Sequence, residues 1–75
     1  MMESIQEEDG ILFNVVRADV SSYDPYDIMD FVKGGFCKVI LIIDEITIRT
    51  YYFKNGVETS KEKILQDERL KQLRR

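Results

Sequence analysis

The chain has 75 residues, a net charge of −3 and 44% hydrophobic residues, with Cys37 as its single cysteine. This length allows one small domain over residues 1–75, and the hydrophobic content is too high for a disordered chain. An intrachain disulfide is excluded, and the longest apolar run is far below the roughly 20 residues that span a bilayer. We therefore expect a soluble, cytoplasmic protein with no membrane partner.

Charge is distributed unevenly along the chain. Residues 1–30 hold eight acidic residues against one basic residue, which is −7, whereas residues 31–75 hold ten basic and six acidic residues, which is +4. Such a dipolar molecule favours head-to-tail contacts or a charged partner, or it simply has a soluble surface.

Residues 1–9 are expected to form a flexible N-terminus. The first predicted strand covers residues 11–19. After the turn pair Asp9-Gly10, the sequence ILFNVVRADV is rich in β-branched and large apolar residues, with Phe13, Val15 and Arg17 on one face.

A helix is predicted over residues 25–33. Asp24 is a good N-cap, Pro25 suits the first helical position, and Gly34-Gly35 supplies a left-handed end. Apolar residues recur between these signals at helical spacing: Ile28, Phe31 and Val32.

The exposed side of this helix carries Asp27 and Asp30. Two carboxylates fall well short of the six to eight oxygen ligands that calcium takes, so a solvated helix face explains them better than a metal site. Neighbouring Tyr23 and Tyr26 keep open a third interpretation, an acidic and aromatic surface for a protein partner.

Three strands are predicted next. Phe36–Asp44 is the most apolar segment and indicates a central strand buried on both faces. Residues 45–53 follow after a tight Asp44-Glu45 turn, although one long bent strand over both segments is the alternative. Asn55-Gly56 then predicts a type I′ turn into a short strand over residues 57–59.

The C-terminal segment, residues 60–75, is predicted to be helical, with the helix over about 60–73. Thr59 and Glu62 are spaced as a capping box. The leucines Leu65, Leu70 and Leu73 form an apolar stripe that leaves Ile64 outside it.

The predicted order is β-α-β-β-β-α. This is an α+β domain with a mixed, mostly antiparallel sheet and two helices packed against it. The strands before and after the first helix are expected to pair in parallel through a crossover.

Catalysis has few candidate groups in this sequence. There is no histidine, no phosphate-binding glycine loop and no zinc-ligand spacing. We expect no enzyme, no cofactor and no metal.

The strand over residues 45–53 offers a basic and aromatic face. Arg49, Tyr51 and Phe53 alternate onto it, with Lys54 next in sequence, while Ile46, Ile48, Thr50 and Tyr52 take the opposite face, which is interpreted as the core side. The first set could stack unpaired bases, with helix residues Arg69, Lys71 and Arg74 on the phosphates. The net acidity argues against this, and the C-terminal helix or a second subunit is the alternative cover for this face.

The sequence thus favours a non-catalytic protein–protein interaction module, a small regulator, adaptor or inhibitor that forms a homodimer. Two contact faces are predicted, one with Tyr23, Tyr26, Asp27 and Asp30 and the other with Arg49, Tyr51 and Phe53. Single-stranded nucleic-acid binding through Arg49, Tyr51, Phe53, Lys54, Arg69, Lys71 and Arg74 is the alternative.

Overall fold

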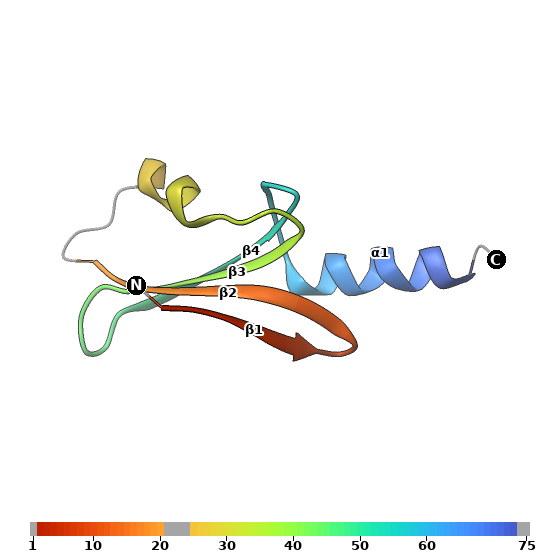
Figure 1. Ribbon diagram of the computed structural model, residues 1–75, viewed down its shortest axis with the longest axis horizontal. Helices are drawn as coiled ribbons and strands as arrows, with labels where there is room; N and C mark the ends of the chain where they lie inside the picture. The colour runs from red at the N-terminus through yellow and green to blue at the C-terminus, as the bar shows by residue number, and fades with distance from the viewer. Residues whose placement is uncertain (1, 21–24, 74–75) are drawn as a thin grey trace.

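A five-stranded mixed sheet with one C-terminal α-helix forms the molecule (Figure 1). The computed structural model describes residues 2–20 and 25–73. The elements in chain order are β1 (Met2–Glu8), β2 (Ile11–Asp19), the 3-10 helix η1 (Pro25–Phe31), β3 (Phe36–Ile42), β4 (Ile48–Lys54), β5 (Val57–Thr59) and α1 (Lys61–Leu73).

The strands lie in the sheet in the same order as in the sequence, β1-β2-β3-β4-β5. β2 and β3 pair in parallel across the η1 crossover, and every other pair is antiparallel. The α+β class, the parallel pair and the central position of β3 are therefore confirmed.

β1 is a strand that the sequence analysis does not predict. Instead of a flexible N-terminus at residues 1–9, Met2–Glu8 pairs with β2 along seven residue pairs. Asp9 and Gly10 form the connecting turn with φ of 53° and 83°, as a tight hairpin requires. All but one residue of β1 are exposed, and its segment has no alternating apolar pattern. Backbone pairing with β2 holds it in the sheet, together with ion pairs from Glu3 to Lys33 and from Glu8 to Lys38.

The prediction of two helices packed against the sheet is wrong in part. Residues 25–31 form a 3-10 helix instead of an α-helix over 25–33, and α1 is the one α-helix among the described residues. The Val32 amide donates to the Met29 carbonyl at 3.3 Å, an i to i+3 contact. This seven-residue run is longer than the three or four residues usual for 3-10 geometry. Its Ile28 packs into the sheet core, and such a tertiary contact can override local helix signals.

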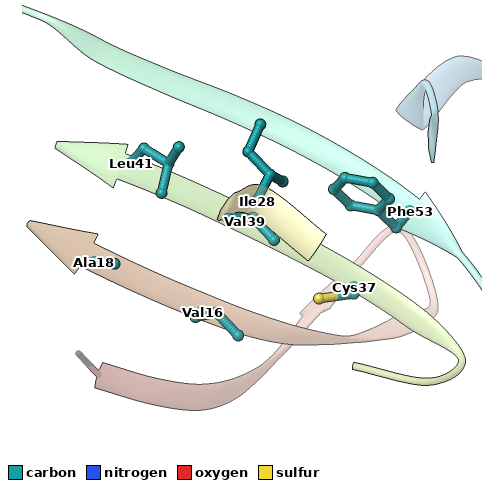
Figure 2. Packing of buried hydrophobic residues seen from close by; sticks show 7 residues of the cluster. All are labelled: Val16, Ala18, Ile28, Cys37, Val39, Leu41 and Phe53. Atoms are coloured by element: carbon teal, nitrogen blue, oxygen red, sulfur yellow. The ribbon is translucent and has the colours of Figure 1, made fainter. Parts of the chain in front are cut away.

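η1 covers one face of the sheet, which we call the η1 face (Figure 2). Its Ile28 packs onto Val39 and Phe53, which belong to the central strands. The buried residues of this cluster are Val16, Ala18, Ile28, Cys37, Val39, Leu41 and Phe53.

The connection between β3 and β4 is longer than the predicted two-residue turn. β3 ends at Ile42 and β4 begins at Ile48, so Asp44 and Glu45 lie within a five-residue loop. Asp44 Oδ1 accepts hydrogen bonds from the backbone amides of Ile46 and Thr47, at 2.9 Å and 2.8 Å. The carboxylate thereby takes the role of a turn former, and this local bonding favours a loop over a tight hairpin.

These bonds predict an acid-sensitive loop. The amide of Ile46 first, and then Thr47, lower the pKa of Asp44 below its ordinary value of 3.8. A lowered folded-state pKa stabilises the loop above the ordinary value, and this contribution is lost as pH falls through the lowered pKa. In an NMR titration we therefore expect the Ile46 and Thr47 amide shifts to move together below pH 3.8.

Asp44→Asn is the matched control for this titration, because its side-chain oxygen keeps the acceptor and does not titrate. The shifts of Ile46 and Thr47 should then be flat over the same pH range. A midpoint above pH 3.8 in the wild-type chain would contradict the role of these bonds.

Candidate protein-binding surface

The second sheet face, which we call the α1 face, is organised in rows that the strand register defines. Residues paired across neighbouring strands point to the same side of a sheet. One row joins Asp19, Ile42 and Ile48, and the next joins Arg17, Ile40 and Thr50, with Met2 at its edge. Two further rows lie nearer to α1 and contain Val15, Lys38 and Tyr52, then Phe13, Phe36 and Lys54.

The first turns of α1 cover only the rows nearer to it. Ile64 is 1% exposed and packs in a cluster with Ile11, Phe13 and Val15, against which half-buried Leu65 also lies. Phe13 is itself enclosed by aromatic rings, with centroids 5.9 Å away at Phe36 and 5.8 Å away at Tyr52. This end of the α1 face is a closed core.

The far rows of the α1 face lack such a cover. We call them the open half, which comprises Met2, Arg17, Asp19, Ile40, Ile42, Ile48 and Thr50. Ile48 is 52% exposed and Met2 is 72% exposed, and Arg17, Asp19 and Thr50 are also exposed. Exposed Ile48 and half-buried Ile42 thus form an apolar surface in the last row, whereas half-buried Ile40 packs against the core that α1 covers. An exposed apolar patch of this kind marks an interaction site.

Ion pairs fix the point at which α1 leaves the sheet. Glu8 Oε1 lies 3.2 Å from Lys38 Nζ, and Lys61 Nζ lies 3.2 Å from Asp9 Oδ2 and 3.9 Å from Glu8 Oε2. Burial lowers the pKa of Lys38, but its contacts with Glu8 and Tyr52 raise it by more, so the net shift is upward. The hydrogen bond with Asp9 raises the pKa of Lys61. These pairs join the β1–β2 turn to β3 and to the first turn of α1.

Beyond this point α1 projects away from the sheet (Figure 1). Of the predicted stripe, Leu65 packs against the sheet core but Leu70 is 50% exposed. Ile64, which was placed outside that stripe, is the buried anchor of α1. An isolated helix of about 12–15 residues is marginal in water, yet α1 has 13 residues and buries only its beginning. Its outer part therefore lacks the packing surface that would stabilise it.

The overall shape reflects this projection. The molecule measures 47 × 21 × 20 Å, with a radius of gyration of 13.4 Å. A compact chain of this length has a radius of about 11 Å. The difference comes from a helix that extends the sheet lengthwise when it could have folded back over the open half.

Two contact faces were predicted for a protein partner, and the structure describes the side chains of only four of their seven residues. Asp30 is exposed at the end of η1, while Tyr23 and the side chains of Tyr26 and Asp27 lie outside the described residues. Arg49 is exposed, whereas Tyr51 is half-buried beside the η1-face core. Phe53 is 3% exposed inside that core, so its predicted contact role is corrected.

The nucleic-acid hypothesis loses Phe53 as a base-stacking residue, because Phe53 is buried in the core. The face that carries Arg49, Tyr51 and Phe53 is the η1 face, and Ile28 covers it near Phe53 (Figure 2). Lys54 points to the opposite face, 5.9 Å from the Phe36 ring. Arg69 and Lys71 are exposed on α1, where Lys71 pairs with Glu68 at 3.5 Å, and Arg74 lies outside the described residues. The structure does not bring these residues together around a base-stacking ring.

The prediction that only one face of β4 is a core face is wrong in part, because both faces are covered near Tyr52 and Phe53 and both are exposed near Ile48 and Arg49. Ile48 and Thr50, expected in the core, are exposed, and Tyr52 of the same set is half-buried. Alternation correctly separated the two sets, but alternation cannot say which face receives a cover. The isoleucines of the open half were visible in the sequence as apolar residues, and nothing local marked them as uncovered.

Catalytic and metal-binding features are sparse in the described part of the chain. Residues 2–20 and 25–73 contain no group of three or more histidine, cysteine, aspartate or glutamate residues placed to hold a metal ion. Within the same residues, no helix is long and apolar enough to cross a membrane. The lone thiol, Cys37, is fully buried under η1.

Comparison with known proteins does not identify a family. No protein-family model, no curated protein and no solved structure matches the chain. The function is therefore argued from the open half and α1 themselves.

Proposed function

We propose that the chain is a non-catalytic protein–protein interaction module, a small regulator or adaptor that acts as a homodimer. The observation that supports this proposal is the combination of an uncovered apolar sheet surface and a projecting helix on the same side of the sheet. Ile48 is 52% exposed in the open half, and Leu70 is 50% exposed on α1. A cytoplasmic location belongs to the proposal, supported by a single, buried cysteine.

The size of the domain supports association as well. A chain of this length buries only about 60% of its unfolded surface, so its stability margin is small. Full burial of a large apolar side chain is worth about 1.5–3 kcal/mol, and Ile48, which is 52% exposed, would gain part of this if a partner buried it. Association would recover this free energy and give the outer part of α1 a second surface.

Substitution of Ile48 tests the proposal. We expect Ile48→Gln to weaken self-association by at least about tenfold, because a twofold dimer loses the apolar contact twice. The measurement is sedimentation equilibrium over a wide concentration range, with the fold checked by circular dichroism. The same variant should weaken capture of any protein partner that uses this face.

Ile46→Gln is the matched control. Ile46 is 93% exposed in the β3–β4 loop, two residues from Ile48 but outside the open half. It should associate as the wild-type chain does. Equal behaviour of the two variants would remove the open half as the contact surface, and a wild-type chain that stays monomeric at high concentration would remove the homodimer.

A further inference from the structure

We propose that the surface covering the open half is α1 of a second copy, in a twofold arrangement that exchanges the helices. Each α1 begins on its own sheet at Ile64 and continues over the open half of its partner. This inference rests on the proposed function and specifies its geometry: two sheets enclose an antiparallel pair of helices. Three observations support it, namely length, side-chain chemistry and charge.

The lengths match. A 13-residue helix is about 20 Å long. From Phe13, under the start of α1, to Asp19, in the last row of the open half, there are six residue steps, or about 20 Å of strand. Because α1 projects along the long axis of the molecule (Figure 1), a twofold rotation about the start of the helix reverses its direction. The partner helix then runs back along the strands with its C-terminal end toward Asp19.

The outer side of α1 has suitable chemistry for an apolar sheet surface. Leu65, Leu70 and Arg69 share one side of the helix, where they line a shallow hollow of about 310 Å³ together with Glu62 and Gln66. Leu70, which is 50% exposed, can cover the apolar pair Ile42 and Ile48 of the last row, while half-buried Leu65 stays against the core of its own chain. Arg69 lies between these leucines in the sequence and extends a cation toward the end of the sheet.

The charges are complementary in this arrangement. Asp19 and Glu45 line a hollow of about 530 Å³ at the far end of the sheet, together with Asp44 and the apolar residues Val20, Ile42 and Ile43. The last turns of α1 are basic, with Arg69 and Lys71 exposed. A twofold exchange places this basic end of each helix against the acidic end of the other sheet. The uneven charge of the chain thereby becomes a pair of identical head-to-tail contacts.

The position of Arg17 agrees with the same placement of the partner helix along the strands. It is the exposed cation of the open half, one row nearer to α1 than Asp19. In α1 the acidic residues Asp67 and Glu68 precede Arg69 and Lys71. A partner helix running toward Asp19 therefore presents its acidic residues near Arg17 before its basic ones reach Asp19.

A charge exchange between two variants tests this geometry. One variant carries Arg69→Glu and Lys71→Glu, and the other carries Asp19→Lys and Glu45→Lys. Asp44 is left unchanged because its carboxylate organises the β3–β4 loop. Each variant alone should self-associate at least about tenfold more weakly than the wild-type chain, since both contacts of its homodimer become repulsive. An equimolar mixture should recover near wild-type affinity, because both contacts of the mixed dimer are again attractive.

Lys63→Glu is the control for a charge change on α1 outside this contact. Lys63 is exposed and is absent from the hollow that Leu65, Arg69 and Leu70 line. Its variant should associate nearly as the wild-type chain does and gain nothing from mixing with the Asp19→Lys, Glu45→Lys variant. Each variant is checked for helix content by circular dichroism before its association is measured.

The outcomes separate the geometry from the function. A wild-type dimer whose charge variants fail to recover on mixing would overturn the helix exchange and leave the protein-binding proposal intact. A wild-type monomer would overturn the exchange together with the homodimer.

Cross-linking provides a second readout of the geometry. A chain with Leu70→Cys mixed with a chain with Ile48→Cys should form a mixed cross-link through a short bis-maleimide. Absence of that cross-link in a confirmed dimer would also reject the exchange.

Discussion

Phe13→Ala is expected to destabilise the protein by about 3–5 kcal/mol, the usual range for truncating a buried phenylalanine. Phe13 is 0% exposed, and its ring joins Phe36, Tyr52 and Ile64 at the covered end of the α1 face. A domain of this size has a free energy of unfolding of roughly 4–11 kcal/mol. The substitution therefore removes a large fraction of the total stability. Urea unfolding at one fixed protein concentration measures it.

Leu12→Ala is the matched control for this experiment. Leu12 precedes Phe13 on β2 but points to the opposite side, where it is 65% exposed. Its truncation should cost less than about 1 kcal/mol, a value typical of exposed strand positions. Equal losses at the two positions would contradict the alternation of β2 and the position of the core.

Ile64→Ala is the second substitution with a large expected loss of stability, and we expect this loss to be confined to α1. Ile64 is 1% exposed and is the buried anchor of α1, so its truncation should cost about 2–5 kcal/mol at the helix–sheet contact. Because an isolated helix of this length is marginal in water, α1 should unfold locally while the sheet remains. Hydrogen exchange should then show lost protection in α1 and retained protection in β2 and β3.

Lys63→Ala is the control for Ile64→Ala, because it introduces alanine at the neighbouring position, where the side chain is exposed. It should leave the exchange pattern of α1 unchanged. Retained protection of α1 in the Ile64→Ala chain would mean that another contact holds the helix. In the helix-exchange dimer, Ile64→Ala should also weaken self-association, since a frayed α1 cannot cover the partner.

Local sequence signals determined several elements of this protein. β2 lies at the predicted residues 11–19, because its alternation and the preceding Asp9-Gly10 turn are strong short-range signals. Asn55-Gly56 forms its turn with φ of 51° and 82°, since asparagine and glycine tolerate the positive φ that a two-residue hairpin requires. The C-terminal helix, too, lies within one residue of its predicted start.

Other features depended on what a segment packs against. The β1 segment has no apolar alternation, so only its partner β2 defines it as a strand. The segment at residues 25–31 carries helix signals, yet it forms a 3-10 helix whose Ile28 packs into the core with Val39 and Phe53.

The candidate surface was the least predictable part, for a physical reason. The sequence determined that β4 has two chemically different sides and that the chain is acidic at its start and basic at its end. Only the tertiary structure decided that η1 covers the side with Phe53, that Ile64 anchors α1, and that Ile48 is exposed. Periodicity records which residues share a face, whereas the cover of that face depends on contacts between segments distant in the sequence.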